Sequence, residues 1–186
     1  MLIEYADLWL AAVIGAVLCW VASALIHMVL KYHNKDYQGL SNEDEVREAI
    51  RSGSPQPGFY NIPYCTDMKE MAEESMQAKM REGPVGFVTI IPSGMPAMGK
   101  LLGLQFAHFL LACVLIGYCA ALALPPGSEY LTVFRFVMAV GFVAFGLGNI
   151  PYSIWYGQPW GTTLRFLLDA FIYGAVVAGV FAWQWP

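Results

Sequence analysis

The sequence has little charge. Only 13% of its 186 residues are Asp, Glu, Lys or Arg, whereas 58% are hydrophobic, and the mean hydropathy is +0.51. A soluble domain has roughly 25% charged residues, so this composition excludes both a soluble globular protein and a disordered chain, and indicates a membrane protein. The net charge of -4 leaves no basic excess to neutralise phosphates, which excludes a nucleic acid as partner.

The sequence also lacks the local motifs of soluble enzymes and metal sites. It has four cysteines, of which only Cys65 lies outside the long apolar runs, and their spacing gives neither a disulfide framework nor a CxxC pair. There is no phosphate-binding loop, dinucleotide fingerprint, nucleophile elbow or HExxH motif. We therefore expect a protein that is not an enzyme, that has no metal site and no cofactor, and whose cysteines serve as small packing residues.

Four apolar runs are long enough to cross a hydrocarbon core of about 30 Å as helices. A run this long without alternation is a helix and not a barrel strand. The sequence predicts an all-α integral membrane protein with a small α+β cap inserted between its first two helices, divided into residues 1–30, 31–100 and 101–186. The predicted membrane helices are 8–30, 101–124, 131–150 and 162–185.

The positions of the basic residues predict the orientation in the lipid bilayer. Eight of the ten Lys and Arg residues lie between Lys31 and Lys100, whereas the other connection and both termini have none. The positive-inside rule then places residues 31–100 in the cytoplasm and both termini outside. The first run lacks a basic start and is too long for a signal peptide, so we expect it in the mature protein. The absence of a transit peptide favours a bacterial inner membrane.

Small residues recur every four positions in the predicted helices, as in Ala12/Ala16, Cys113/Gly117 and Ala170/Gly174. Such spacing permits close helix approach in a membrane. The pattern fits a four-helix bundle within one chain and equally fits the face of a homo-oligomer.

The inserted segment contains helix and strand signals of its own. Capping patterns and Gly or Pro stops predict helices over residues 42–52 and 67–82. Apolar, β-branched runs predict paired strands over 59–65 and 85–91. Because many apolar side chains of this segment need covering, we expect an ordered cap rather than a linker.

One broad side of the predicted helix 67–82 is rich in methionine. A soft apolar face of this kind packs against the rest of the cap or docks another protein. The docking candidates are Met68, Met71, Met76 and Met80.

Polar residues of three predicted membrane helices fall at similar depth, about 5–10 Å from the cytoplasmic ends. Those on one helix are three or four apart and share a face. We expect the faces to converge, with Arg165 as the first candidate partner of Asp169 and His108 as the second, because an isolated intramembrane carboxylate is costly. His33 is expected to be a surface residue. The predicted intramembrane cluster comprises His27, Gln105, His108, Arg165, Asp169 and Tyr173.

Three interpretations of this cluster remain open at this point. It is a structural polar latch, or a transport or proton-relay site working through His108 and Asp169, or a pair of axial ligands, His27 and His108, for a b-type haem. A depth difference of about 5 Å between the two histidines weakens the haem interpretation.

The preferred functional hypothesis is a structural or accessory subunit that binds other membrane proteins. It rests on the lack of catalytic motifs and on a cap rich in apolar contact groups. The alternatives are a small transporter or proton-conducting protein and, second, a b-type haem membrane protein.

Overall fold

The structure is a computed structural model, and it describes residues 5–186. The chain forms two compact units. The first, which we call the helix bundle, contains the chain up to Tyr37 and from Pro96 onward, and the second, the inserted unit, is Gln38–Met95. The prediction of a mainly helical protein with four membrane-length helices and a small two-stranded sheet is confirmed.

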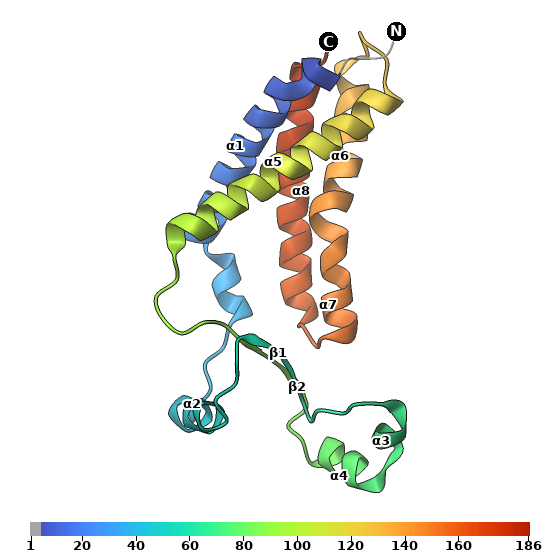
Figure 1. The fold of residues 1–186 in the computed structure, drawn as a ribbon. Coiled ribbons are helices and arrows are strands. Elements are labelled where there is room, and N and C mark those ends of the chain that lie inside the picture. Colours follow the sequence, from blue (N-terminus) through green and yellow to red (C-terminus); the bar gives the residue numbers. More distant parts are fainter. Residues whose placement is uncertain (1–4) are drawn as a thin grey trace. The chain divides into compact units, whose positions relative to one another are not determined.

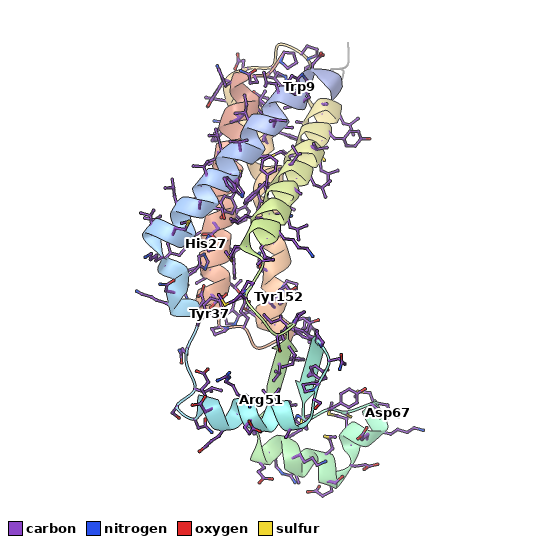
Figure 2. All side chains as sticks on the ribbon, turned by 60° about the vertical axis from the view of Figure 1, so that its left-hand side comes forward. Trp9, His27, Tyr37, Arg51, Asp67 and Tyr152 are labelled. Atoms are coloured by element: carbon purple, nitrogen blue, oxygen red, sulfur yellow. The ribbon has the colours of Figure 1, made fainter. Side chains whose placement is uncertain are left out.

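Four helical segments in residues 5–186 are long and apolar enough to cross a membrane, namely Trp9–Leu30, Met98–Ala123, Tyr130–Trp155 and Trp160–Trp183. Consecutive segments run in opposite directions (Figure 1). Trp9 lies at one end of the bundle, whereas His27 and Tyr152 lie toward the other (Figure 2). The elements of the bundle are η1 (Tyr5–Leu8), α1 (Trp9–Leu25), η2 (Ile26–Leu30), η3 (Tyr32–Asp36), α5 (Met98–Ala123), α6 (Tyr130–Gly146), η4 (Leu147–Asn149), α7 (Ile150–Trp155) and α8 (Trp160–Trp183).

Glycines allow α6 and α8 to pack very closely. A Cβ atom placed on Gly141 would lie 3.1 Å from the Cα of Gly174 on the facing helix, and one on Gly146 would lie 2.8 Å from the Cβ of Ala170. Backbones approach this closely only where side chains are minimal. The small residues at these positions therefore pack within the chain.

Two of the four segments are irregular near the same end of the bundle. The first finishes as a π-helix, in which the Lys31 N–H donates to the Ile26 carbonyl five residues earlier at 2.8 Å. The third passes through the short 3-10 segment η4, which follows Gly146, before α7 begins with a proline near its first turn. Glycine and proline at these positions weaken regular α-helix.

The inserted unit has the predicted kinds of element with different bounds. Strands β1 (Gly58–Ile62) and β2 (Gly86–Ile90) pair antiparallel, with Tyr60 opposite Val88. The single helix expected over 67–82 is instead two helices, because Glu73 takes an extended conformation between them. The helices of this unit are α2 (Glu43–Ser52), α3 (Met68–Ala72) and α4 (Glu74–Glu82).

The break at Glu73 changes the prediction of a methionine docking face. Met76 is only 3% exposed, so it is an interior side chain of this unit and not a surface contact, whereas Met68 is 80% exposed. Met71 is exposed and Met80 is half-buried. The four methionines thus do not form one continuous face on one helix.

Candidate functional site

The site begins with a reversal of the chain after the first membrane segment. Lys31 adopts a left-handed conformation with φ 52°, which is uncommon for a residue with a side chain. The following segment η3 folds back and packs against α8. This reversal brings Tyr32, His33 and Asp36 to the first half of α8.

His33 lies at the centre of a buried hydrogen-bonded cluster. Its Nδ1 is 2.6 Å from Oδ2 of Asp36, and its Nε2 is 2.9 Å from Oδ2 of Asp169. The side chains of these three residues are each at most 7% exposed. The expectation that His33 is a surface residue is therefore wrong, because the reversal at Lys31 turns it back into the bundle.

Both carboxylates of the cluster accept further hydrogen bonds. The Tyr32 hydroxyl donates to Oδ1 of Asp169. Thr162 Oγ1, at 2.9 Å, and Arg165 Nε, at 2.6 Å, donate to Oδ1 of Asp36. Every carboxylate oxygen in the cluster has a donor, which is the condition for keeping a charge buried.

The environment shifts the pKa of two groups in η3. Burial acts to raise the pKa of Asp36, but hydrogen bonds from Arg165, His33 and Thr162 and the charge of Arg165 hold it below its usual value. Burial, followed by the hydrogen bond to Asp169 and the charge of that group, raises the pKa of Tyr32. Asp36 is therefore ionised and Tyr32 neutral over the physiological range.

The cluster joins η3 to α8. The His33 imidazole lies between the carboxylates of Asp36 and Asp169, and Asp36 in turn pairs with Arg165. These contacts fix η3 on α8 and hold the Asp169 side chain in place.

Arg165 and Asp169 do not pair as the sequence suggested. Arg165 forms its ion pair with Asp36, while Asp169 is bonded by Tyr32 and His33. Sequence reasoning missed Tyr32, His33, Asp36 and Thr162 as members of the site. The i, i+3 spacing of His33 and Asp36 was a signal, but nothing in the sequence indicated that the chain reverses at Lys31.

The other predicted residues of the intramembrane cluster line one cavity of about 660 Å³ beside this buried cluster. A volume of this order is typical of small-molecule sites. All four long apolar segments contribute to its wall, the first of them partly through η2. The predicted residues that line it are His27, Gln105, His108, Asp169 and Tyr173.

The polar groups of the cavity wall share one chemical property. They are one carboxylate, two imidazoles, two amides and two hydroxyls, and no Lys or Arg is among the lining residues. Each has oxygen or nitrogen lone pairs to offer. Within residues 5–186, the side chains of Gln105 and His108 have no hydrogen-bond partner in the protein, so their polar atoms remain available to the cavity.

Part of the cavity wall is aromatic. Phe109 lies edge-to-face with Tyr173, with ring centroids 5.1 Å apart, and Phe145 lies edge-to-face with Tyr173 at 5.8 Å. His108 contacts Phe145 in the same manner at 6.4 Å. These rings form one packed aromatic group in the wall.

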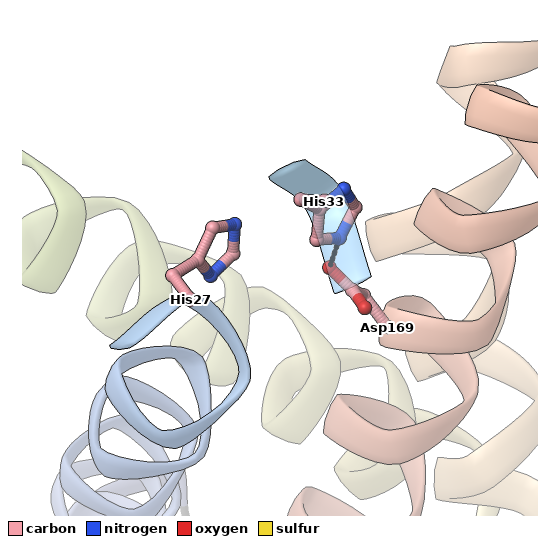
Figure 3. Close-up of side chains that lie close together, drawn as sticks. All are labelled: His27, His33 and Asp169. Atoms are coloured by element: carbon pink, nitrogen blue, oxygen red, sulfur yellow. Dashed lines mark hydrogen bonds and ion pairs between the residues drawn. The ribbon is translucent and has the colours of Figure 1, made fainter. Parts of the chain in front are cut away.

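Three side chains at the boundary between the cavity and the buried cluster form a group suited to a metal ion. The ligand atoms of His27, His33 and Asp169 all lie within 4.8 Å of one another. They come from three different elements, η2, η3 and α8, and Figure 3 displays their arrangement. Sequence reasoning expected His27 and Asp169 to converge, but it left out His33 and did not predict a metal site, because no two of the three residues have metal-ligand spacing.

Comparison of the chain with protein-family models, with curated proteins and with solved structures gives no match.

Proposed function

We propose that this protein is a small multi-pass membrane transporter that carries a small cation through the cavity between its four membrane helices. The observation that carries the proposal is the cavity of about 660 Å³, whose wall includes five of the six polar residues expected to converge. Polar side chains at membrane depth cost free energy unless they meet a partner or water. Here these polar side chains line a cavity, which favours a polar ligand bound in that cavity.

The chemistry of the wall favours a cation. Asp169 supplies an anionic oxygen, the neutral polar groups supply lone pairs, and no basic side chain among the lining residues opposes a positive charge. Four aromatic side chains also line the cavity, and the face of an aromatic ring attracts a cation; they are Trp20, Phe109, Phe145 and Phe166. An anionic solute lacks a basic side chain to bind in this wall, and a strongly apolar solute would leave the polar groups of the wall without partners.

The buried cluster supports the same role by positioning Asp169. Its two oxygens are held by Tyr32 and His33, and Asp36 and Arg165 in turn hold His33 and the segment η3. A site residue fixed in this way keeps one geometry while an ion enters and leaves.

Flux into proteoliposomes tests the proposal. Purified protein is reconstituted with separate encapsulated dyes that report H⁺, Zn²⁺ and Mn²⁺, and uptake of each ion is driven by an inside-negative potential. We expect flux of at least one of these cations, and we expect Asp169→Asn and His108→Ala each to reduce it at least about tenfold.

The matched control is Leu111→Ala, which lies three residues beyond His108 on α5 and is 59% exposed on the outer face of the bundle. It should leave flux unchanged. Flux that survives both Asp169→Asn and His108→Ala, or no flux of any tested cation above protein-free vesicles, would overturn the proposal. Size-exclusion profiles of all variants exclude unfolding as the reason for a loss.

The orientation of the protein in the membrane, predicted from its Lys and Arg residues, determines the side from which the cavity is filled. The end of the bundle that holds the cavity and His27 is the end from which the inserted unit leaves the first segment, so the positive-inside rule makes it the cytoplasmic end. We place the protein in a bacterial inner membrane with its termini outside. The cavity then receives its ion from the cytoplasm.

A second candidate function is the accessory subunit that binds other membrane proteins. The specific observation in its favour is a hollow of about 530 Å³ on the two-stranded sheet, lined by Phe59, Tyr60, Asn61, Tyr64 and Phe87. Exposed aromatic groups of this kind are enriched at interfaces. Purification in mild detergent should then recover a stoichiometric partner that Tyr64→Asp releases, and a homogeneous species of unchanged mass counts against this role.

A further inference from the structure

We propose that His27, His33 and Asp169 bind a divalent transition-metal ion of the Zn²⁺ type. The ion would be the substrate class of the proposed transporter. This identification rests on the proposed function, whereas the binding site itself stands on the geometry of the three side chains.

The three ligand atoms are close to the separation that a metal needs. Ligands of a tetrahedral Zn²⁺ ion lie about 2.0–2.2 Å from the metal and so about 3.3 Å from one another. His33 Nε2 and Asp169 Oδ2 are already 2.9 Å apart, and all three ligand atoms fall within 4.8 Å. His27 supplies the remaining movement, because it is exposed and its one side-chain hydrogen bond within residues 5–186 is to the Ser23 carbonyl of its own segment.

Both histidines are oriented as metal-binding histidines are. The Nδ1 of His27 is 2.9 Å from the Ser23 carbonyl, and the Nδ1 of His33 is 2.6 Å from the Asp36 carboxylate. A carbonyl only accepts, so His27 has its proton on Nδ1 and offers the lone pair of Nε2. Metal-bound histidines nearly always donate their second N–H to a carboxylate or backbone carbonyl, which fixes the tautomer and the ring orientation.

The backbone of the site is irregular where His27 and His33 meet. His27 lies on the π-helical turn η2, and the left-handed Lys31 separates it from His33. The two imidazole rings lie 4.9 Å apart and almost parallel. Single π turns and left-handed non-glycine residues are concentrated at functional sites. Here they bring two histidines that are six residues apart in the sequence next to the carboxylate of Asp169.

The site has an open side. His27 and Asp169 both line the 660 Å³ cavity, whereas His33 lies behind them in the buried cluster. Three protein ligands with a fourth position open to a cavity are typical of metal sites at which a ligand exchanges. Two imidazoles and one carboxylate suit Zn²⁺ and its neighbours better than Mg²⁺ or Ca²⁺, which take oxygen ligands.

Binding would displace one proton. The proton in the bond between His33 Nε2 and Asp169 Oδ2 would leave to water in the cavity as the metal binds these two atoms, so the site would gain one net positive charge. His33 keeps its Nδ1 proton toward Asp36, so the connection to Arg165 is unchanged.

Metal titration of the purified protein tests the inference. The full chain is purified without a histidine tag, treated with chelator and titrated with Co²⁺, whose visible spectrum reports tetrahedral coordination, and with Zn²⁺ by calorimetry. We expect one site per chain. His27→Ala should weaken affinity at least about 100-fold. Asp36→Asn alters the carboxylate bonded to His33 Nδ1, which is not itself a ligand, and should weaken affinity about 10–100-fold.

The matched control is Leu111→Ala, because Leu111 is 59% exposed and belongs neither to the cavity wall nor to the ligand group. It should leave metal affinity unchanged. Unchanged affinity in His27→Ala, or loss of affinity in Leu111→Ala equal to that in His27→Ala, overturns the site. Metal binding without flux of any cation sustains the site and overturns the transport proposal, so the two failures are distinguishable.

Discussion

The imidazole of His27 lies parallel to that of His33, with ring centroids 4.9 Å apart and an interplanar angle of 2°. The stacking exists because the chain unwinds into a π turn after α1 and reverses at Lys31. The stacking places His27, an exposed residue of the cavity wall, against His33, a member of the buried cluster. The cavity and the cluster are thus parts of one site, and predictions follow for each part.

The first prediction concerns the stability supplied by the buried cluster. Asp36→Ala removes the partner of both His33 and Arg165, leaving buried polar groups unpaired, and should lower the free energy of unfolding by about 3–5 kcal/mol. The free energy of unfolding is measured in mixed micelles that contain an increasing fraction of denaturing detergent. Asp44→Ala removes a partner of Arg47 in an exposed pair and should cost less than about 1 kcal/mol. Equal losses in the two variants would refute a stabilising cluster.

The second prediction concerns pH. Arg165, Thr162 and His33 face Asp36, and the pKa of Asp36 is lower in the folded state than in the unfolded chain. Its contribution to stability is therefore complete above the ordinary value of 3.8 and is lost as the pH falls through the lower folded-state value. The melting temperature should drop as the pH is lowered below about 3.8, and drop less in Asp36→Asn. An identical pH dependence in both proteins would rule out this contribution.

The third prediction concerns the contact between α6 and α8. Gly141→Ala places a methyl group 3.1 Å from the backbone of Gly174, which has no side chain to move away, and should destabilise the bundle by about 1–3 kcal/mol. Gly103→Ala on α5 meets nothing within 4 Å and should be neutral or slightly stabilising. The same unfolding assay measures both. Only Gly141→Ala should lower the free energy of unfolding, and a neutral Gly141→Ala would contradict the close packing.

Much of this contact was predictable from the sequence, and the buried cluster was not. Small-residue spacing and apolar length follow from composition and periodicity, so the four segments and the small residues Ala170 and Gly174 on α8 could be named in advance. The convergence of His27, Gln105, His108 and Asp169 also followed from helix depth. The position of Asp36 beside α8 depends on the left-handed conformation of Lys31, and no local sequence pattern specifies that conformation. The break between α3 and α4 at Glu73 likewise could not be predicted, because no Gly or Pro lies at that position.

The fourth prediction concerns orientation. In a background whose native cysteines are replaced, Ser128→Cys lies in the turn between α5 and α6, and Ser54→Cys lies in the inserted unit. A membrane-impermeant maleimide added to intact cells should label Ser128→Cys, and should label Ser54→Cys only after the cells are opened. The reverse result would invert the topology and place the cavity mouth outside.

The central claim is that the cavity admits cations, and the rate of thiol modification inside it tests this most directly. Ser23→Cys puts a thiol in the cavity wall beside His27, in a chain in which Cys65 and Cys119 are replaced by serine and the buried Cys19 and Cys113 are kept. A cationic methanethiosulfonate should react at least about tenfold faster than an anionic one of similar size, Zn²⁺ should slow the reaction, and modification should abolish flux. Equal rates for the two reagents, with flux unchanged after modification, would contradict the account.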